Sequence, residues 1–147
     1  MKIQKFNPAF DKSFPIIWIP ALLILAVGTV LAALEPIALF VMIPTDLFTI
    51  YFLISPLFGY VELRESSVFV KFGLFAKREI PYSKIRGITK ERKLYADSMM
   101  SLKNALEHVN IKHNTFDVTS VSVKDNDEFI SALEERIKQL KIESAEN

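Results

Sequence analysis

The sequence contains no cysteine and only four glycines, and its formal net charge is +1. The lack of cysteine excludes a disulfide framework, a thiolate nucleophile and a cysteine-based zinc or iron–sulfur site. The four glycines form no phosphate-cradling loop, which argues against a nucleotide-dependent reaction. A balanced charge gives no bulk attraction to nucleic acid. We therefore expect no enzyme, no catalytic residue, no cofactor and no nucleic-acid partner.

Charge is also missing from one region of the chain, residues 14–58, where Glu35 and Asp46 are the only charged side chains. By contrast, residues 59–147 carry fifteen basic and fourteen acidic side chains. At about 1.5 Å per residue, a helix of 20 apolar residues crosses a hydrocarbon core of roughly 30 Å. The uncharged runs on either side of Glu35 and Pro36 therefore predict two transmembrane helices in a hairpin with a short turn. The predicted spans are residues 14–34 and 37–58.

Basic residues flank the predicted hairpin on both sides, and its turn has none. The flanking residues are Lys2, Lys5 and Lys12 before the hairpin, and Arg64, Lys71, Lys77 and Arg78 after it. By the positive-inside rule, both termini are cytoplasmic and the protein is a two-span protein of the cell (inner) membrane. The alternative is a cleaved signal peptide ending near Val30-Leu31-Ala32. A 21-residue apolar run followed at once by a second one argues against it.

Asp46 is an intramembrane polar residue in this topology, and an ionised carboxylate there is costly. One hypothesis is a proton or cation site in a helical oligomer, which would make the chain a small transport or channel-associated subunit. The other is a structural role: Asp46 caps a new helical start after Pro44, or is a protonated hydrogen-bonding residue.

After residue 59, short alternating segments predict an antiparallel sheet. We expect residues 1–13 to be a cytoplasmic N-terminal segment, residues 59–141 to form one domain, and residues 142–147 to be a flexible tail. Within the domain, residues 94–106 are predicted to be a loop with a short helical turn. The final strand, residues 116–123, changes its apolar phase, which predicts a bulge near Thr119 or Ser120. The predicted strands are residues 61–63, 68–72, 77–82, 85–92, 108–113 and 116–123.

The last predicted element is an amphipathic helix that Asp125 or Asn126 caps. Its apolar stripe is Phe129, Ile130, Leu133, Ile137 and Leu140. Overall, the expected fold class is membrane-anchored α+β: a two-helix transmembrane hairpin, then an antiparallel β-barrel or sandwich that the C-terminal helix covers. A soluble domain is expected to remain after removal of residues 1–58.

This order of elements resembles that of the pleckstrin-homology (PH) fold, and residues 60–140 resemble the short bacterial PH-like domain family. The resemblance rests on the first hairpin and on three further segments. These are Ile80-Pro81-Tyr82-Ser83-Lys84-Ile85 with Ile88, Ser98-Met99-Met100-Ser101-Leu102, and Val121-Ser122-Val123-Lys124-Asp125 leading into Glu128-Phe129-Ile130. It implies a PH-like fold next to membrane spans, and it implies no reaction.

Basic residues are concentrated in residues 71–93, which carry eight of them against Glu79 and Glu91. This segment could be a solvated sheet face, a surface for anionic lipid headgroups or a headgroup pocket. The candidate lipid- or partner-binding residues are Lys71, Lys77, Arg78, Lys84, Arg86, Lys90, Arg92 and Lys93. A separate apolar patch for a protein partner is also conceivable, made of Phe69, Phe75, Met99 and Met100.

His108 and His113 are five residues apart on one predicted strand and therefore point to opposite faces, so no metal site is expected. The leading hypothesis is a non-enzymatic membrane protein whose cytoplasmic PH-like domain binds a protein partner or an anionic lipid surface. An immunity-type membrane protein with the same topology is a further alternative. The expected partners are the lipid bilayer, anionic lipid headgroups, and a protein partner or a second copy of the chain in a homo-oligomer.

Overall fold

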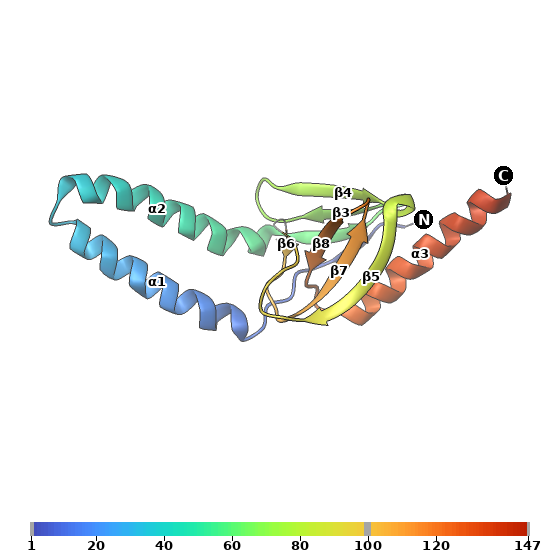
Figure 1. Ribbon diagram of the computed structural model, residues 1–147, viewed down its shortest axis with the longest axis horizontal. Coiled ribbons are helices and arrows are strands. Elements are labelled where there is room, and N and C mark those ends of the chain that lie inside the picture. The colour runs from blue at the N-terminus through green and yellow to red at the C-terminus, as the bar shows by residue number, and fades with distance from the viewer. Residues whose placement is uncertain (1, 99–100, 147) are drawn as a thin grey trace.

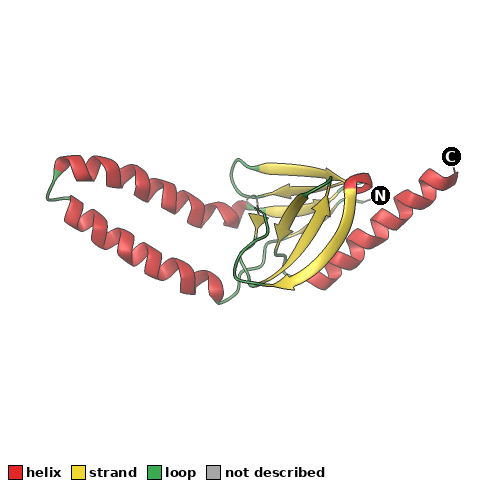
Figure 2. Ribbon diagram, viewed as in Figure 1, coloured by secondary structure: helices red, strands yellow, loops and turns green. Residues whose placement is uncertain are grey.

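Two long apolar helices form an antiparallel hairpin that extends from one end of a β-sandwich (Figures 1 and 2). The structure is a computed structural model that describes residues 2–98 and 101–146. Helix α1 is Ser13–Ala32 and helix α2 is Pro36–Ile54, and the short 3₁₀ helix η1 (Ser55–Phe58) follows α2. Both segments are long and apolar enough to cross a membrane by length and composition. Their bounds lie within two residues of those predicted, except that the α-helical part of the second segment ends at Ile54.

Helix α2 continues through Pro44, so the prediction that Asp46 caps a new helical start is wrong. A proline inside a helix removes one hydrogen bond and can bend the helix without ending it. The helix instead begins at Pro36, a position that suits proline because the first amides of a helix have no partner within it.

The sandwich consists of two four-stranded sheets. The first sheet has the order β1 (Gln4–Phe6), β2 (Tyr60–Leu63), β3 (Ser67–Lys71) and β4 (Lys77–Pro81), with every pair antiparallel. The second sheet has the order β5 (Ile85–Arg92), β7 (Glu107–His113), β8 (Asp117–Val121) and β6 (Ser101–Leu102), and only the β6–β8 pair is parallel. The 3₁₀ helix η2 (Tyr82–Lys84) connects the two sheets.

Helix α3 (Asn126–Glu146) packs onto the sandwich and contributes Phe129 and Leu133 to its core. The apolar stripe explains this placement, because Ile130, Ile137 and Leu140 are partly buried beside those two residues. Asp125 is the cap, since its Oδ1 accepts a hydrogen bond of 2.8 Å from the Glu128 amide. The strands contribute alternate residues to the same core, with Val61, Leu63, Val68 and Val70 fully buried.

The N-terminal segment is part of the domain, which corrects the predicted division between residues 1–13 and residues 59–141. Strand β1 pairs with β2, and Pro8 forms a bridge with Val123. The Ala9 amide donates to the Ser122 carbonyl at 2.9 Å. Removal of residues 1–58 would therefore take away one strand of the first sheet, which argues against the expectation that the remaining fragment stays folded.

Three local predictions also need correction. The β7–β8 pairing runs without a bulge near Thr119 or Ser120. The end of strand β8 is buried on both faces, so its apolar and polar residues do not have to alternate. This explains the change of apolar phase without a bulge. Helix α3 continues to Glu146, where a flexible tail was predicted from residue 142. Among the described residues of 94–106, the structure has strand β6 and no helical turn.

The two ends of the sandwich differ in what they carry (Figure 1). We name the end next to the helices the hairpin end; it contains loop 72–76 and the β5–β6 loop. We name the opposite end the distal end; it contains turn 64–66, η2 and turn 114–116. Both chain termini lie toward the distal end.

Candidate functional site

The eight basic residues predicted as one binding face are distributed over both ends of the sandwich. Lys71 and Lys77 lie beside loop 72–76 at the hairpin end. Lys84 and Arg86 lie at the distal end, where the Lys84 carbonyl accepts from the Asn114 amide and Arg86 donates to the Thr115 carbonyl. The structure therefore does not form one continuous basic face from all eight.

Several of these side chains are engaged by neighbours. Lys90 Nζ lies 2.9 Å from Asp127 and 3.0 Å from Glu107, and the hydrogen bonds to these two carboxylates raise its pKa. Lys93 Nζ lies 2.5 Å from Glu91 and 3.4 Å from Asp97. Lys90 thus links β5 to the start of α3. Lys93 forms a local charged cluster with Glu91 and Asp97.

Of the remaining predicted basic residues, Arg78 and Arg92 have no ion pair with a carboxylate among the described residues. Arg78 reaches β8, where Nη1 lies 3.4 Å from the hydroxyl of Thr119. Arg92 is exposed at the hairpin end of β5, opposite Glu107 in the β5–β7 register.

Lys71 and Lys77 are direct cross-strand partners in the β3–β4 register. Like charges in this arrangement repel each other. Within the described parts of the chain, neither ammonium forms an ion pair with a carboxylate, and Lys71 Nζ lies 5.6 Å from the Tyr60 ring centroid. Two uncompensated cations at one loop base are therefore available to an external anion.

Loop 72–76 lies against the base of the helical hairpin. The Phe75 ring stacks on Tyr51 of α2 with centroids 6.0 Å apart, although Phe75 is 82% exposed. The Leu74 amide donates to Ser55 Oγ at 3.3 Å. A side chain at Gly73 would overlap Ser55, so glycine permits this close approach. The loop thus reaches the level of the last turn of an apolar helix.

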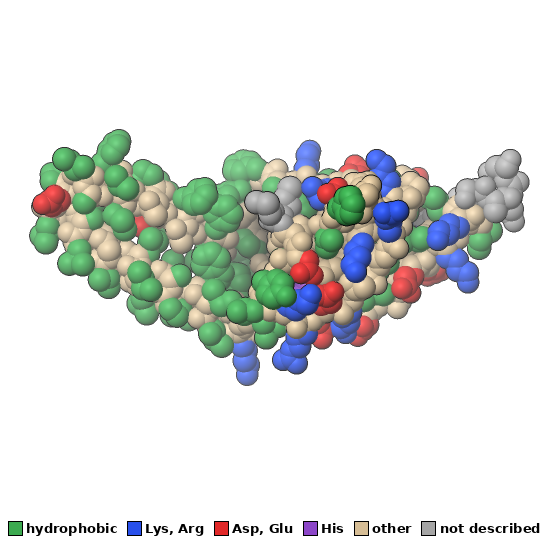
Figure 3. Space-filling model, in the orientation of Figure 1, with side chains coloured by type: hydrophobic (Ala, Val, Ile, Leu, Met, Phe, Trp, Pro, Cys, Tyr) green, Lys and Arg blue, Asp and Glu red, His purple; other side chains and the backbone are tan. Residues whose placement is uncertain are grey.

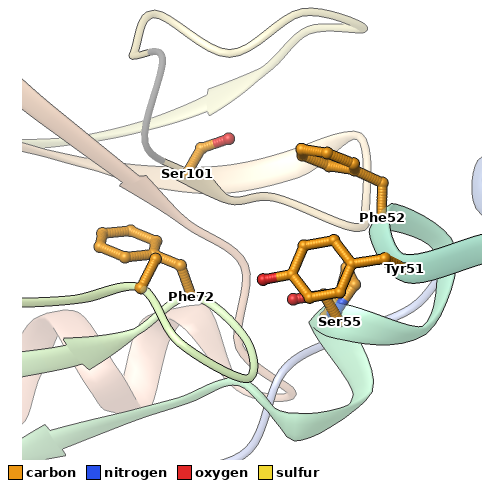
Figure 4. A pocket seen from close by; sticks show the side chains of 7 residues that line it. Tyr51, Phe52, Ser55, Phe72 and Ser101 are labelled. Carbon is orange, nitrogen blue, oxygen red and sulfur yellow. The ribbon is translucent and has the colours of Figure 1, made fainter. Parts of the chain in front are cut away.

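A cavity of about 260 Å³ lies at the same junction (Figure 4). Tyr51 and Ser55 extend from the end of α2 and η1 toward Phe72, and Ser101 of β6 borders the opposite side. The lining is mainly apolar, with three hydroxyl groups. Such a lining suits part of an amphipathic molecule.

The β5–β6 loop is the second loop at the hairpin end, and it exposes Leu94 (68%) and Tyr95 (65%). Lys103 anchors it, because Nζ donates to the carbonyls of Lys93 and Leu94 at 2.7 and 3.0 Å. Burial lowers the pKa of Lys103, and the nearby carboxylates Asp11 and Asp97 oppose that effect.

Two of the four residues of the predicted apolar patch, Phe69 and Phe75, are described. Phe75 is exposed, while Phe69 is partly buried and its ring faces the Arg64 guanidinium at 3.9 Å. Met99 and Met100 lie outside the described residues. The two loops at the hairpin end expose the apolar side chains of Leu74, Phe75, Leu94 and Tyr95.

Asp46 joins the two helices of the hairpin. Its Oδ2 accepts a hydrogen bond of 2.7 Å from the Thr29 hydroxyl of α1, and its Oδ1 is buried with no partner among the described residues. The contact is consistent with a hydrogen-bonding role for Asp46. The sequence could suggest such a residue but not its partner, which lies 17 positions away.

The structure also forms a cluster that the sequence analysis missed. Glu91 and His108 are cross-strand partners, and Asp97 comes from the loop after β5. One ligand atom from each lies within 4.8 Å of the others. The sequence gives no local signal for this cluster, because the β5–β7 pairing that places Glu91 opposite His108 joins residues 17 positions apart.

Residues 59–137 match the bacterial PH domain, which is more than half of the chain. The chain belongs to the bacterial PH domain family. The predicted resemblance is thereby confirmed. The matched range contains strands β2 to β8 and the first part of α3, whereas β1, which pairs with β2, lies outside it. No curated protein and no solved structure matches the chain.

Proposed function

We propose that the chain is a non-enzymatic membrane protein whose helical hairpin crosses the bilayer and whose PH domain binds the anionic leaflet through its hairpin end. The stack between Phe75 and Tyr51 carries this proposal. Tyr51 lies inside the apolar helix α2, so an exposed phenylalanine of the domain lies at the depth where that helix enters the bilayer.

The exposed apolar surface of the hairpin supports insertion. No residue of α2 is buried, and in α1 only Ala32 is. Hydrophobic side chains cover the hairpin, whereas Lys, Arg, Asp and Glu are concentrated over the sandwich (Figure 3). Soluble monomers rarely expose an apolar surface of this extent, because its hydration is unfavourable. A bilayer removes that surface from water.

Charge at the hairpin end supports a preference for anionic lipid. Lys12 is exposed immediately before α1, and Lys71 and Lys77 flank the loop that carries Phe75. A basic residue near an anionic leaflet contributes about 1 kcal/mol, and the attraction falls off within a Debye length. In this orientation the distal end, with Lys84 and Arg86, faces away from the leaflet.

The mechanism is confinement with a fixed orientation. The hairpin keeps the domain at the membrane, which raises its effective concentration there, and loop contacts then set which end touches the lipid. Weak individual contacts suffice in this arrangement, because the tether supplies the encounter.

The test uses the full chain in lipid vesicles with a single tryptophan reporter. In a Trp18→Phe background, Phe75→Trp places the reporter at the hairpin end, and Phe116→Trp places it at the distal end, where Phe116 is 93% exposed. Brominated acyl chains should quench the Phe75→Trp fluorescence strongly and leave the Phe116→Trp fluorescence nearly unchanged. Equal quenching of the two reporters, or none of either, would refute the proposed orientation.

The charge component is tested with the same Phe75→Trp reporter. Quenching should increase on going from neutral to anionic vesicles, and added salt should reduce that increase. Lys71→Gln with Lys77→Gln should abolish most of the increase. The matched control, Lys84→Gln with Arg86→Gln, removes the same charge from the distal end and should preserve it. A larger loss in the control would place the lipid contact at the distal end.

A further inference from the structure

His108 is fully buried, and its ring nitrogens have different environments. Nδ1 lies 3.0 Å from the Leu106 carbonyl, an oxygen that can only accept, so Nδ1 carries the proton in this contact. Nε2 is buried and has no hydrogen-bond partner among the described residues. In the neutral ring, Nε2 therefore presents a free lone pair.

Two carboxylates accompany this lone pair. Glu91 lies directly opposite His108 on β5, and Asp97 reaches over the same sheet face from the loop after β5. The Lys93 ammonium compensates part of the charge of the two carboxylates, but no described group donates to His108 Nε2. A lone pair beside two carboxylates attracts a cation. The atoms are within 4.8 Å of one another, whereas ligand atoms around a tetrahedral zinc ion are about 3.4 Å apart, so small side-chain movements bring them to coordination distance.

Surrounding side chains hold the three groups in place. Asn110 Nδ2 donates to Asp97 Oδ2 at 2.7 Å, and the Ser120 hydroxyl in turn donates to Asn110 Oδ1 at 2.6 Å. The Thr89 hydroxyl lies 3.5 Å from Glu91 Oε1. An imidazole whose other nitrogen donates to a backbone carbonyl, and a carboxylate that is itself hydrogen-bonded, are typical of metal ligands.

We propose that Glu91, Asp97 and His108 form a binding site for a first-row divalent cation of the zinc type. Imidazole nitrogen with two carboxylate oxygens suits Zn²⁺ better than Ca²⁺ or Mg²⁺, which prefer oxygen ligands alone. Three protein ligands leave one position for water. Bound metal would fix the β5–β6 loop, which carries the exposed Leu94 and Tyr95, onto the sheet. This site is separate from the proposed lipid surface and does not depend on it.

Lys93 acts as an internal competitor for this site. Its ammonium lies between the carboxylates, 2.5 Å from Glu91 Oε2 and 3.4 Å from Asp97 Oδ2. The side chain is 37% exposed, and Nζ is also 5.6 Å from the Tyr95 ring centroid. Metal binding moves the ammonium outward, where the ring and water can receive it. Removal of the Lys93 side chain should therefore increase the affinity of the site for a divalent cation.

The test measures Zn²⁺ binding to the full chain in detergent, purified without a histidine tag, by competition with a chromophoric chelator. We expect one Zn²⁺ per chain. Asp97→Asn and Glu91→Gln should each weaken binding more than about tenfold, and Lys93→Met should tighten it several-fold. Asp97 is in an exposed loop, so its variant should fold even if a substitution of the buried His108 does not.

His113→Gln is the matched control, because His113 is a second buried histidine on the opposite face of β7. Its affinity for Zn²⁺ should equal that of the parent chain. Absence of stoichiometric Zn²⁺ binding would overturn the proposal, as would affinities unchanged by Asp97→Asn and Glu91→Gln or weaker binding by Lys93→Met. Tighter binding of Mg²⁺ than of Zn²⁺ would exclude an imidazole ligand and would also overturn it.

Discussion

At the scale of single residues, burial in the core lowers the pKa of His113. It is 4% exposed, and its Nε2 lies 2.9 Å from the Thr119 hydroxyl. Burial first, and then the Arg78 guanidinium, lower the pKa of His113 below its ordinary value of 6.5, while Asp117 opposes them. The folded chain therefore holds a neutral imidazole at a pH where the unfolded chain has begun to bind a proton.

The consequence is a loss of stability under mildly acidic conditions. Above pH 6.5 both states are neutral at this residue and its full contribution is present. As the pH falls through 6.5, only the unfolded state takes up the proton, so the free energy of unfolding decreases. We expect the melting temperature of the full chain in detergent to fall between pH 7.5 and 5.5, and to fall less in His113→Gln. A pKa of His113 at or above 6.5, measured by NMR in the folded chain, would contradict this prediction.

At the scale of secondary-structure elements, β1 has the largest unexpected effect on the domain. Phe6 is 7% exposed, pairs with Val61 and packs its ring edge-to-face on Phe129 of α3 with centroids 5.2 Å apart. Phe6 thus links the first sheet to the C-terminal helix. A soluble form of the domain has to retain residues 1–12 and replace residues 13–58 with a linker.

Phe6→Ala should destabilise the domain by about 3 kcal/mol or more, because truncation of a buried phenylalanine loses apolar burial and leaves a cavity. Ile3→Ala is the control, since Ile3 is a large apolar residue three positions away that is 61% exposed, and it should change stability by less than about 0.5 kcal/mol. Denaturant unfolding of the full chain, followed by circular dichroism, measures both. Similar losses in the two variants would show that β1 does not contribute to the core.

Periodic elements were predictable from the sequence and non-local ones were not. Strand β5 was predicted with its observed bounds, and α3 with its observed stripe, because each has its signal within its own residues. Strand β1 has three residues and pairs with a segment more than fifty positions later, so no local period reveals it. The division of the basic residues between two ends, and the cluster around His108, also depend on strand pairing and loop placement. The number and order of the charged residues in the sequence do not show which of them lie close together in the fold.

At the scale of the whole molecule, the chain divides into an apolar hairpin and a charged domain that meet at one end (Figure 3). Loop 72–76 contacts η1 through Ser55, and Asp11 accepts from the Leu106 amide at 2.7 Å just before α1. Both helices of the hairpin are thus tied to the same end of the sandwich. If the hairpin crosses a membrane, the turn at Glu35 and the distal turn at Phe116 must lie on opposite sides of it.

This topology can be tested directly because the chain has no cysteine of its own. Single substitutions Glu35→Cys and Phe116→Cys place one thiol at each exposed turn. The basic flanks of the hairpin predict a cytoplasmic domain. A membrane-impermeant maleimide should therefore label Glu35→Cys in spheroplasts and Phe116→Cys only in inverted vesicles. The roughly 30 Å of hydrocarbon between the two turns separates the reagent from the other thiol. Labelling of both variants from the same side would show that the hairpin lies on the membrane without crossing it, and the reverse pattern would invert the orientation.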